Sequence, residues 1–426
     1  MDVAIVQGIN GARYQVFLMW WLYNQAMRLF SFALSLRAWW HPETRAWNAL
    51  RKQHLQHVTT IRREAGDRPI VWMHCASLGE FEQGLPVLKM VRRHNEDVYL
   101  VVSFFSPSGY LQRKNTDHAD AVIYLPIDTH SHATQVIQGL RPSLFMGVKY
   151  EFWWNYLRIL LERHVPVVYL SVKLKPDSYL WTSRAAVFRK CMRGFAMIFT
   201  QDSATEKALK EAGISNVIAA GDTRVSAVLD RQKKAVGIKH LEVLRSQKRP
   251  VMIYGSVYTS DLPFITEMLN QKDWTHIVVP HKVDKDTLKN LTSPLPHHHL
   301  WSSWNGTWTS NILVVDVLGR LFDLYAYADC AYIGGGFERS VHNTLEPAAF
   351  GLPLAFGPKN KGFVETAYFL EKGIATEIRE EGTLRSFAER AISERPMIQQ
   401  AIESYFEEHS QAMMRIEDWF LKYYFK

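Results

Sequence analysis

Three consecutive glycines, Gly334, Gly335 and Gly336, come directly after an apolar run with the composition of a buried strand. Glycines at a strand end let the backbone approach a phosphate closely, and their N–H groups can point towards it. Asn343 and Glu346 follow at the three-residue spacing of a helix start, and a carboxylate there can also accept both hydroxyls of a ribose. The pattern predicts a site for a phosphorylated ligand, and its alternative is a glycine-rich turn with an ordinary helix cap.

A second strand end, much earlier in the chain, carries the sequence H-C-A-S-L-G-E. Its residues Ser77 and Gly79 are small enough for a tight turn and a close approach of ligand. Glu80 then stands in the first turn of an expected helix, where a carboxylate can take a proton from a hydroxyl nucleophile. Charge compensation at a helix N-terminus is the alternative role for Glu80.

Three further turns follow other expected strands. Ser108 belongs to an S-P-S-G turn, whose hydroxyls and N–H groups suit either an anion or a helix N-cap. Glu151 stands among a lysine and three aromatic residues that can stack on a sugar or belong to the core. Arg224 ends a G-D-T-R turn and is expected near a cleft between two domains, with an ordinary surface arginine as the alternative.

The elements that position these turns alternate regularly. Short, continuously apolar strands are separated by amphipathic helices, a pattern typical of parallel sheets covered on both faces. The expected strands are residues 70–77, 98–105, 121–126, 143–148, 166–172, 197–201, 251–256, 276–280, 312–316, 330–335 and 353–358. A basic stretch at 231–249 divides them into two doubly wound α/β domains, which bind ligands outside the carboxyl ends of their strands. The segment 292–310 is expected to be an exposed loop whose histidines are solvated rather than bound to metal.

Residues 14–40 are unusually apolar and aromatic, but two arginines interrupt them, so a membrane-spanning helix is not expected. Asn24, Arg28, Ser31 and Ser35 share one narrow stripe of a helix, and the rest of its surface is mostly apolar. Such a helix either lies in a membrane interface, with the basic residues that follow it on acidic headgroups, or is buried against the core or a partner subunit. We predict peripheral or monotopic attachment on the cytoplasmic side of a membrane.

The composition bounds the whole chain. Its 426 residues, 47% hydrophobic and 22% charged, are globular in character and too many for one ordinary domain. We expect an apolar membrane-association segment at 1–50, Rossmann-like domains at 51–230 and 231–400, and a C-terminal helix at 401–426 that packs on the first domain. The net charge of +8 suits anionic partners, but no dense Lys/Arg tract indicates nucleic acid. Three cysteines, far apart, predict neither a disulfide framework nor a zinc site.

Taken in order, these motifs resemble those of the Kdo (3-deoxy-D-manno-octulosonic acid) transferases of lipopolysaccharide synthesis. The matching run extends from about His74 to about Glu365. Its most specific parts are H-x-A-S-x-G-E at the start and H-N-x-L-E-P near the end, with S-P-S-G, E-x-W, G-D-x-R and F-G-P in the family's order.

The resemblance implies the GT-B fold, in which two Rossmann-like domains face each other across a cleft. It implies inverting transfer of Kdo from CMP-Kdo to a tetraacyl precursor of lipid A, at the cytoplasmic face of the inner membrane, without a metal or any other cofactor. Glu80 matches the family's catalytic base. The positions matching the acceptor side or the cleft are Ser77, Gly79, Ser108, Glu151 and Arg224. Those matching the CMP side are Ser256, Gly334, Gly335, Gly336, Asn343 and Glu346.

The chain also departs from the family pattern. The family's V-P-R-H is here Val279-Pro280-His281-Lys282, so we expect His281 or Lys282 to contact the donor in place of an arginine. A lysine, Lys149, stands where the family has an acidic residue before Glu151. The alternative function is a GT-B transferase that uses another nucleotide sugar on a different acceptor. An oxidoreductase is disfavoured because G-x-G-x-x-G is absent, and a silent scaffold because the Glu80 motif is intact.

Overall fold

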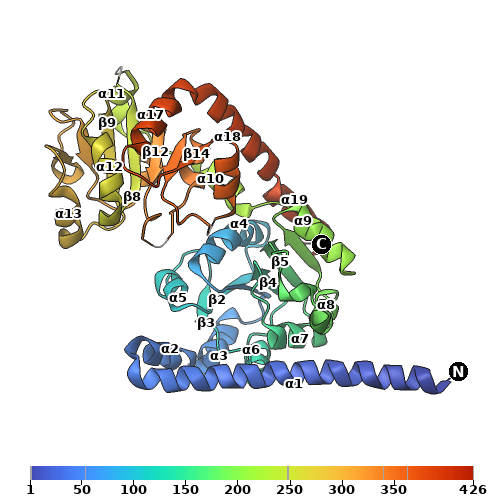
Figure 1. Ribbon diagram of the computed structural model, residues 1–426. Coiled ribbons are helices and arrows are strands. Elements are labelled where there is room, and N and C mark those ends of the chain that lie inside the picture. The colour runs from blue at the N-terminus through green and yellow to red at the C-terminus, as the bar shows by residue number, and fades with distance from the viewer. Residues whose placement is uncertain (1, 53, 247–248, 339, 362, 426) are drawn as a thin grey trace. The chain divides into compact units, whose positions relative to one another are not determined.

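Two all-parallel sheets, each of seven strands in the part of the chain described here, organise the computed structural model (Figure 1). The structure describes residues 2–52, 54–246, 249–338, 340–361 and 363–425. It divides into an N-terminal domain, residues 1–224 with 410–426, and a C-terminal domain, residues 225–409. The chain thus changes domain slightly before the expected position 230–231, and it returns to the first domain after the expected position 401.

The N-terminal sheet reverses its strand order beside its central strand. Its strands are β1 (Ile70–Cys75), β2 (Tyr99–Phe104), β3 (Ala121–Tyr124), β4 (Leu144–Val148), β5 (Val167–Val172), β6 (Met197–Thr200) and β7 (Val217–Ala219). They follow the order β3-β2-β1-β4-β5-β6-β7, so the reversal lies between β1 and β4. On β1, Cys75 is opposite Phe104 and His74 is opposite Gly147. Doubly wound sheets bind ligands at this reversal.

Helices cover both faces of this sheet (Figure 1). They are α1 (Asp2–Trp40), α2 (Pro42–Lys52), α3 (His54–Ala65), α4 (Leu78–His94), α5 (Pro107–Arg113), α6 (His130–Leu140), α7 (Trp154–Glu162), α8 (Ala186–Met192), α9 (Ser203–Glu211), α10 (Thr223–Gln232), which continues into the C-terminal domain, and α19 (Ala412–Tyr423), with short 3₁₀ turns η1 (Tyr179–Trp181) and η2 (Ser183–Ala185). The last of them, α19, buries Ile416 and Phe420 in a core cluster shared with α4.

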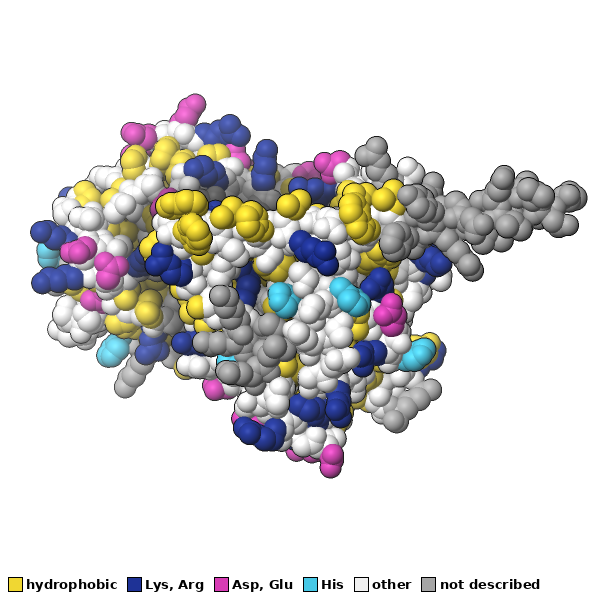
Figure 2. Space-filling view, turned by 90° about the horizontal axis from the view of Figure 1, so that it is seen from below, with side chains coloured by type: hydrophobic (Ala, Val, Ile, Leu, Met, Phe, Trp, Pro, Cys, Tyr) yellow, Lys and Arg dark blue, Asp and Glu magenta, His cyan; other side chains and the backbone are white. Residues whose placement is uncertain are grey.

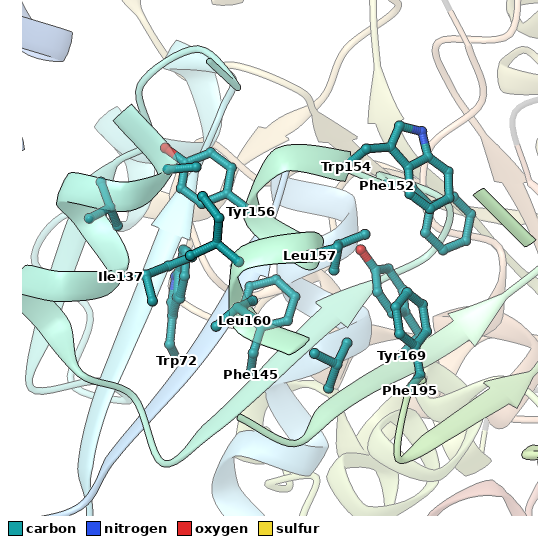
Figure 3. Packing of buried hydrophobic residues seen from close by; sticks show 14 of the residues in the cluster. Trp72, Ile137, Phe145, Phe152, Trp154, Tyr156, Leu157, Leu160, Tyr169 and Phe195 are labelled. Carbon is teal, nitrogen blue, oxygen red and sulfur yellow. The ribbon is translucent and has the colours of Figure 1, made fainter. Parts of the chain in front are cut away.

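Large aromatic side chains fill the core on the α7 side of the sheet (Figure 3). Trp72 is fully buried and meets the Phe145 ring edge-on, with 4.8 Å between the ring centroids. Leu157 and Leu160 of α7 belong to the same cluster. Burial of each such side chain contributes about 1.5–3 kcal/mol to folding. Because the central strands are buried on both faces, they consist of continuous apolar runs, which are easy to recognise in the sequence.

The C-terminal sheet repeats the same plan. Its strands are β8 (Val251–Val257), β9 (Thr275–Pro280), β10 (His299–Leu300), β11 (Ile312–Val314), β12 (Cys330–Ile333), β13 (Leu354–Phe356) and β14 (Ala375–Glu377). Their order is β10-β11-β9-β8-β12-β13-β14, with the reversal between β8 and β12. The other helices and 3₁₀ turns of this domain are η3 (Lys239–Leu241), α11 (Glu242–Ser246), η4 (Thr259–Asp261), α12 (Leu262–Leu269), α13 (Lys285–Thr292), η5 (Trp301–Ser303), α14 (Leu321–Leu324), η6 (Tyr325–Tyr327), α15 (Leu345–Ala349), α16 (Val364–Glu371), α17 (Thr383–Ser393) and α18 (Arg395–His409).

Three strands, β7, β10 and β14, were not expected from the sequence. All three lie at an edge of their sheet and have only two or three residues, most of them partly exposed. An edge strand pairs on one side only, so it lacks the continuous apolar run that marks a central strand. The segment 292–310 is accordingly not a plain loop, since it contains β10 and η5.

Helix α1 packs Met19, Trp20 and Tyr23 against the core of its own domain, makes polar contacts on that same side, and turns a further apolar side outwards. The Asn24 side-chain oxygen accepts a hydrogen bond from the buried amide of Asn155 at 3.1 Å, and the Tyr23 hydroxyl donates to the buried carboxylate of Asp128 at 2.6 Å. Large exposed side chains form a row along the helix, which we call the apolar ridge (Figure 2). It consists of Trp21, Leu22, Leu29, Phe30, Phe32, Leu36, Trp39 and Trp40. Among the residues described, no helix combines the length and hydropathy of a membrane-spanning segment.

Candidate active site

Glu80 lies at the strand reversal of the N-terminal sheet, in the first turn of α4. Its Oε2 atom accepts the backbone N–H groups of Ala76 and, at 3.3 Å, of Ser77. No residue in the described part of the chain donates to Oε1. One carboxylate oxygen is therefore anchored by the turn, while the other is available to a substrate hydroxyl.

The surroundings of Glu80 make it a stronger base than an ordinary carboxylate. The residue is only 5% exposed, and burial together with the charge of Glu151 raises the pKa of Glu80 to about 7, against the opposing effect of the two N–H groups. General-base catalysis is most effective when the pKa of the base lies near the working pH. The same hydrogen bonds also cap α4, so the helix-start role of Glu80 is compatible with a role as a base.

The turn after β4 brings a cation among the carboxylates of this edge. Lys149 has φ of 61°, in the left-handed region, and its backbone N–H is held by the Leu170 carbonyl at 2.8 Å. The ammonium group interacts electrostatically with Glu80, Glu151 and Asp222, so it lies close to all three. Burial nevertheless raises the pKa of Glu151, against the charge of Lys149. Strained backbone of this kind persists where the surrounding structure fixes it, often at functional sites.

An aromatic wall stands beside the turn after β4. The indole N–H of Trp153 donates to His74 Nε2 at 2.9 Å, and His74 Nδ1 lies 2.8 Å from the Ser103 hydroxyl. Burial lowers the pKa of His74 to about 3, so the ring is neutral and acts as a fixed support for Trp153. The Phe105 ring lies 4.5 Å from that of Trp153. Together these rings provide an apolar surface of the kind that stacks on sugars.

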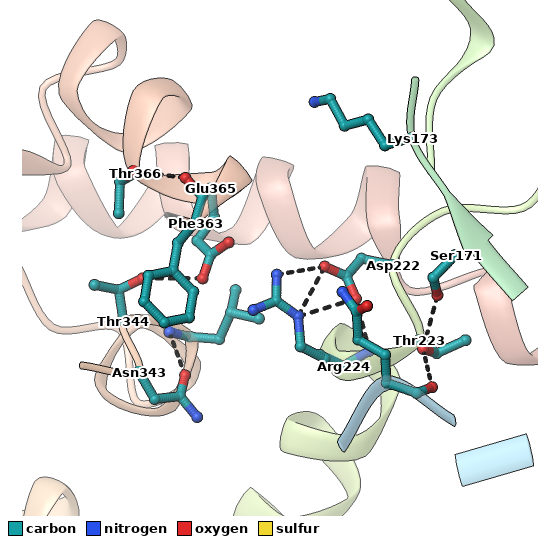
Figure 4. A network of polar contacts seen from close by, with 12 residues as sticks. Ser171, Lys173, Asp222, Thr223, Arg224, Asn343, Thr344, Phe363, Glu365 and Thr366 are labelled. Atoms are coloured by element: carbon teal, nitrogen blue, oxygen red, sulfur yellow. Dashed lines mark hydrogen bonds and ion pairs between the residues drawn. The ribbon is translucent and has the colours of Figure 1, made fainter. Parts of the chain in front are cut away.

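Arg224, expected at a cleft, is held by its neighbour Asp222 (Figure 4). Its Nε and Nη2 atoms donate to Asp222 Oδ2 at 3.0 and 2.6 Å. Burial opposes ionisation of Asp222, but the charge and hydrogen bonds of Arg224 outweigh it, and the pKa of Asp222 lies below its usual value. The guanidinium thus has a structural partner independently of any substrate.

Three smaller residues accompany these groups. Ser77 and Gly79 share the β1–α4 turn with Glu80, and a Cβ added at Gly79 would meet nothing within 4 Å, so there is space beside the base. Ser108 lies in α5, and its side chain is outside the described part of the structure. In the same turn the Ser106 hydroxyl accepts the Gly109 N–H at 3.2 Å, which is the N-cap alternative for this motif.

In the C-terminal domain, the three glycines follow β12 at the second strand reversal and are fixed by close contacts. A Cβ at Gly334 would lie 2.9 Å from the Asp261 carboxylate, and one at Gly336 would lie 2.6 Å from the backbone nitrogen of Gly357. Gly335 has φ of 89°, which side chains rarely tolerate. The packing of neighbouring strand ends therefore requires all three glycines.

The N–H groups of this turn are largely used inside the protein. Gly334 donates to the Gly255 carbonyl at 2.9 Å, and Gly335 donates to the Asp261 carboxylate at 3.3 Å. The expectation that these N–H groups face a phosphate is wrong for both glycines, because the strand ends approach closely enough to bond them directly. What these glycines provide is close approach of the neighbouring strand ends.

Asp261 joins the elements around the glycine turn. One carboxylate oxygen accepts the Tyr332 hydroxyl at 2.8 Å, and the other accepts the backbone N–H groups of Tyr258, at 2.8 Å, and Gly335. The residue is fully buried, and burial raises its pKa although these hydrogen bonds act in the opposite direction. Asp261 thus ties β8, β12 and the glycine turn together.

His281, at the end of β9, joins a small stack of rings beside the same turn. Its ring centroid lies 4.5 Å from that of Tyr258 and 4.6 Å from that of His342, with the planes within 25° of parallel. His342 Nε2 is 3.1 Å from the Tyr258 hydroxyl. Burial and the nearby His281 lower the pKa of His342 to about 4, while burial and Lys282 lower that of His281. Both rings are therefore mainly neutral at pH 7.

The remaining donor-side residues also have partners within the domain. Ser256 has φ of 58° at the end of β8. Asn343 caps α15, since its side-chain oxygen accepts the N–H groups of Leu345 and Glu346 at 3.0 and 3.4 Å. Glu346 forms an ion pair with Arg231 at 2.9 Å. Among the described residues, no group of three or more His, Cys, Asp or Glu side chains could hold a metal ion.

Comparison with known proteins connects this geometry to a family. Residues 49–227 match the family model described as 3-deoxy-D-manno-octulosonic-acid transferase. The chain is 24% identical over 305 residues to the 3-deoxy-D-manno-octulosonic acid transferase of Rickettsia felis, a match that covers 68% of this chain and 64% of that protein. The family-model match and these similarities support the Kdo transferase family for this chain.

Two other comparisons show how much of the relatives the chain covers and which fold it has. A bifunctional glycosyltransferase/methyltransferase of Fusobacterium nucleatum is 25% identical over 321 residues, which is 71% of this chain but only 49% of that protein. The first relatives are thus matched over about half to two thirds of their own length. The UDP-GlcNAc 2-epimerase structure from Neisseria meningitidis aligns with a TM-score of 0.55 and 15% identity, over 83% of this chain and 100% of that one. This likeness confirms the expected fold, two Rossmann-like domains of the GT-B type.

The structure also gives contacts to residues for which the sequence analysis assigned no role. Lys149 and His342 lie inside motifs that carry the resemblance, so a signal for them was present. Tyr258 and Asp261 lie between motifs, and nothing in their local sequence marks them. Only the pairing of β8 with β12 brings these two residues to the glycine turn.

Proposed function

We propose that the chain transfers Kdo from CMP-Kdo to a tetraacyl disaccharide precursor of lipid A, with inversion and without a metal ion. The observation that carries the proposal is the state of Glu80, a buried carboxylate with one anchored oxygen and a pKa of about 7, at the ligand-binding edge of a sheet in a Kdo transferase family chain. The acceptor class and the stereochemistry come from the resemblance to that family.

In this mechanism, Glu80 Oε1 removes the proton of an acceptor hydroxyl as its oxygen attacks the anomeric carbon of Kdo. The new C–O bond forms while the bond from that carbon to the phosphate oxygen breaks, and its electron pair leaves with CMP. The proton stays on Glu80 until it is released to solvent. Base assistance of this kind is worth about 10²–10⁴-fold in rate.

The C-terminal domain would hold the donor and its leaving nucleotide. His281 and Lys282 are basic groups at the end of β9, beside the glycine turn. We assign them to the donor phosphate, because the positive charge of Lys282 and a hydrogen bond from the neutral His281 ring would stabilise the departing oxygen in the transition state. Ser256, Gly334, Gly335, Gly336 and Asn343 would shape the nucleotide pocket, and Glu346 would exchange part of its contact with Arg231 for the ribose hydroxyls.

The apolar ridge supports attachment to the cytoplasmic face of the inner membrane. A bilayer-bound helix buries its apolar side and keeps polar contacts with its protein, which is the orientation that Asn24 and Tyr23 fix in α1. Trp39 and Trp40 are 72% and 76% exposed, and tryptophan favours the membrane interface. Such attachment would keep the chain at the surface in which a membrane-bound acceptor lies. No nucleic-acid partner is proposed.

The test is incubation of the full chain with CMP-Kdo and tetraacyl disaccharide, followed by mass spectrometry of the lipid product. The proposal expects the acceptor to gain one or more Kdo residues. A parallel inhibition panel of CMP, UMP, UDP and GDP addresses the alternative that another nucleotide sugar and acceptor are used. Inhibition by UDP or GDP but not by CMP, with no lipid product, would replace the proposal by that alternative.

A further inference from the structure

A pocket of about 750 Å³ opens between α1, α2 and α6 of the N-terminal domain. Its walls carry two arginines, Arg45 and Arg51, and two serines, Ser31 and Ser35, of which the Ser35 hydroxyl donates to the Ser31 carbonyl at 2.9 Å. No aspartate or glutamate is among the described residues that line it. A positively charged pocket with hydroxyl groups and without competing carboxylates has the chemistry of an anion site.

Arg51 is the innermost cation of this pocket. The residue is only 9% exposed, and its guanidinium lies over the rings of Phe105 and Tyr124, at 4.8 and 5.0 Å from their centroids. It also donates to the Tyr124 hydroxyl at 3.3 Å. Burial lowers the pKa of Arg51, which means that its charge is poorly solvated. A phosphate bound in the pocket would offer the guanidinium an opposite charge and hydrogen-bond acceptors, in place of the water that burial has removed.

The outer wall of the pocket belongs to the apolar ridge. Trp39 lines the pocket and is also one of the most exposed side chains of the ridge. Arg45 donates to the carbonyl oxygens of Ala38 and Trp39, at 3.1 and 2.9 Å, so it is fixed beside the end of α1. A lipid with its phosphate in the pocket would therefore have its acyl chains next to the ridge.

Behind the pocket, the residues that support Arg51 reach the edge of the sheet that carries Glu80. Phe105, under the Arg51 guanidinium, also packs on Trp153 of the aromatic wall. The next residue, Ser106, donates its backbone N–H to the Ala76 carbonyl at 2.8 Å, and the Ala76 N–H in turn bonds Glu80. A continuous series of contacts thus connects the pocket with the proposed base.

We propose that this pocket binds a phosphate group of the membrane-embedded glycolipid acceptor, with Arg45 and Arg51 as its cationic contacts. The inference rests on the proposed function, and it commits to the acceptor rather than to bulk phospholipid because the residues that support Arg51 reach the edge of the sheet that carries Glu80. The acceptor would lie with its acyl chains along the apolar ridge, a phosphate between α1 and α2, and a sugar hydroxyl at the base.

The test uses the full chain and two acceptors in detergent micelles, the phosphorylated tetraacyl disaccharide and the same lipid after enzymatic removal of its phosphates. Transfer from CMP-Kdo and equilibrium binding without CMP-Kdo are both measured. The variants are Arg45→Gln and Arg51→Gln. The control is Arg37→Gln, because Arg37 is an exposed arginine in the last turn of α1 and does not line the pocket. Since Arg51 is buried, the exposed Arg45 keeps the test valid if Arg51→Gln folds poorly.

We expect wild type and Arg37→Gln to have a KM at least roughly tenfold lower for the phosphorylated acceptor. In Arg45→Gln and Arg51→Gln that ratio should fall towards one, while kcat stays within about twofold, since the phosphate contact is uniform binding rather than chemistry. Unchanged ratios in both pocket variants would overturn the inference. If the two pocket variants lost binding to phosphatidylglycerol vesicles while their KM ratios for the two acceptors stayed unchanged, the pocket would be a site for bulk phospholipid and the inference would also be overturned. If nothing is transferred but arginine-dependent binding of the phosphorylated lipid persists, the pocket stands and the transfer proposal fails.

Discussion

Glu80 and Ser77 are joined by a hydrogen bond of 3.3 Å from the Ser77 N–H to Glu80 Oε2, which fixes the direction of a buried carboxylate at the end of β1. The bond does two things at once. It caps α4, and it holds the carboxylate where burial and the charge of Glu151 raise its pKa to about 7. In an exposed helix cap the hydrogen bonds lower the pKa instead, as they do for Asp284 at the start of α13, so titration distinguishes the two roles.

The first prediction concerns the pH dependence of transfer. Glu80 must be ionised to accept a proton, so kcat/KM, which reports the ligand-free enzyme, should fall about tenfold per pH unit below pH 7 and level off above it. The measurement is a profile of kcat/KM from about pH 4 to pH 9. A limb near pH 4.5 would show that the essential carboxylate is not the buried Glu80. Glu82→Gln, on the same helix but half-exposed, should leave the limb in place.

The second prediction concerns the stability of Glu80→Gln. Because the pKa of Glu80 is higher in the folded chain than in the unfolded chain, the folded state binds more protons between the two values, and stability falls as the pH rises through that window up to about 7. The ionised, buried side chain then costs up to about 3 kcal/mol, which the neutral amide avoids. Thermal unfolding midpoints of wild type and variant should agree near pH 4.5, and the variant should be higher at pH 8. An equal or lower midpoint at pH 8 would contradict the buried, high-pKa state.

A third prediction addresses Asp261. Asp261→Ala would leave the Tyr332 hydroxyl and the N–H groups of Tyr258 and Gly335 without their acceptor, at a cost of about 1–3 kcal/mol for each buried donor. We expect a lower thermal midpoint and a donor KM raised by tenfold or more, with the acceptor KM unchanged. The matched control is Asp284→Ala, which removes an exposed helix cap from α13 and should cost about 1 kcal/mol without affecting donor binding. Equal effects of the two variants on donor KM would remove Asp261 from the donor site.

A fourth prediction concerns the apolar ridge. Replacing Leu29 and Trp39 by serine should reduce the fraction of the chain that co-sediments with anionic vesicles severalfold, because each large apolar side chain contributes about 1.5–3 kcal/mol when it leaves water. Leu318→Ser is the control, since Leu318 is 73% exposed but lies in the C-terminal domain. A ridge buried against a partner subunit would instead give variants that change oligomeric state and sediment with vesicles as wild type does.

The central strands could be located from the sequence, because fully buried strands require unbroken apolar runs, whereas the strand order and its two reversals are known only from the structure. It also placed Glu80 correctly at a helix start, since that position depends only on local spacing. The edge strands β7, β10 and β14 were not predicted, because a strand that pairs on one side only does not need a continuous apolar run. The sequence also left open which side of α1 faces its own domain. That depends on hydrogen bonds from Tyr23 to Asp128 and from Asn155 to Asn24, which join residues far apart in the chain.

The donor side was harder to predict for a physical reason. Glycines at a strand end have the same appearance in sequence whether their N–H groups meet a phosphate or a neighbouring strand. Gly334 and Gly335 meet Gly255 and Asp261, which the local sequence cannot show. The left-handed backbone of Lys149 and its place among three carboxylates also depend on the pairing of β4 with β5 rather than on residue type.

The most direct measurement is a single-turnover transfer assay with CMP-Kdo and the tetraacyl disaccharide, comparing wild type with Glu80→Gln and reading the lipid product by mass spectrometry. Calorimetric titration with CMP checks that the variant keeps its donor site. The account predicts Kdo-bearing lipid with wild type, a rate lower by about 10²-fold or more with Glu80→Gln, and equal CMP affinity in both. Product formation by Glu80→Gln at a rate close to wild type would contradict the assignment of Glu80 as the base.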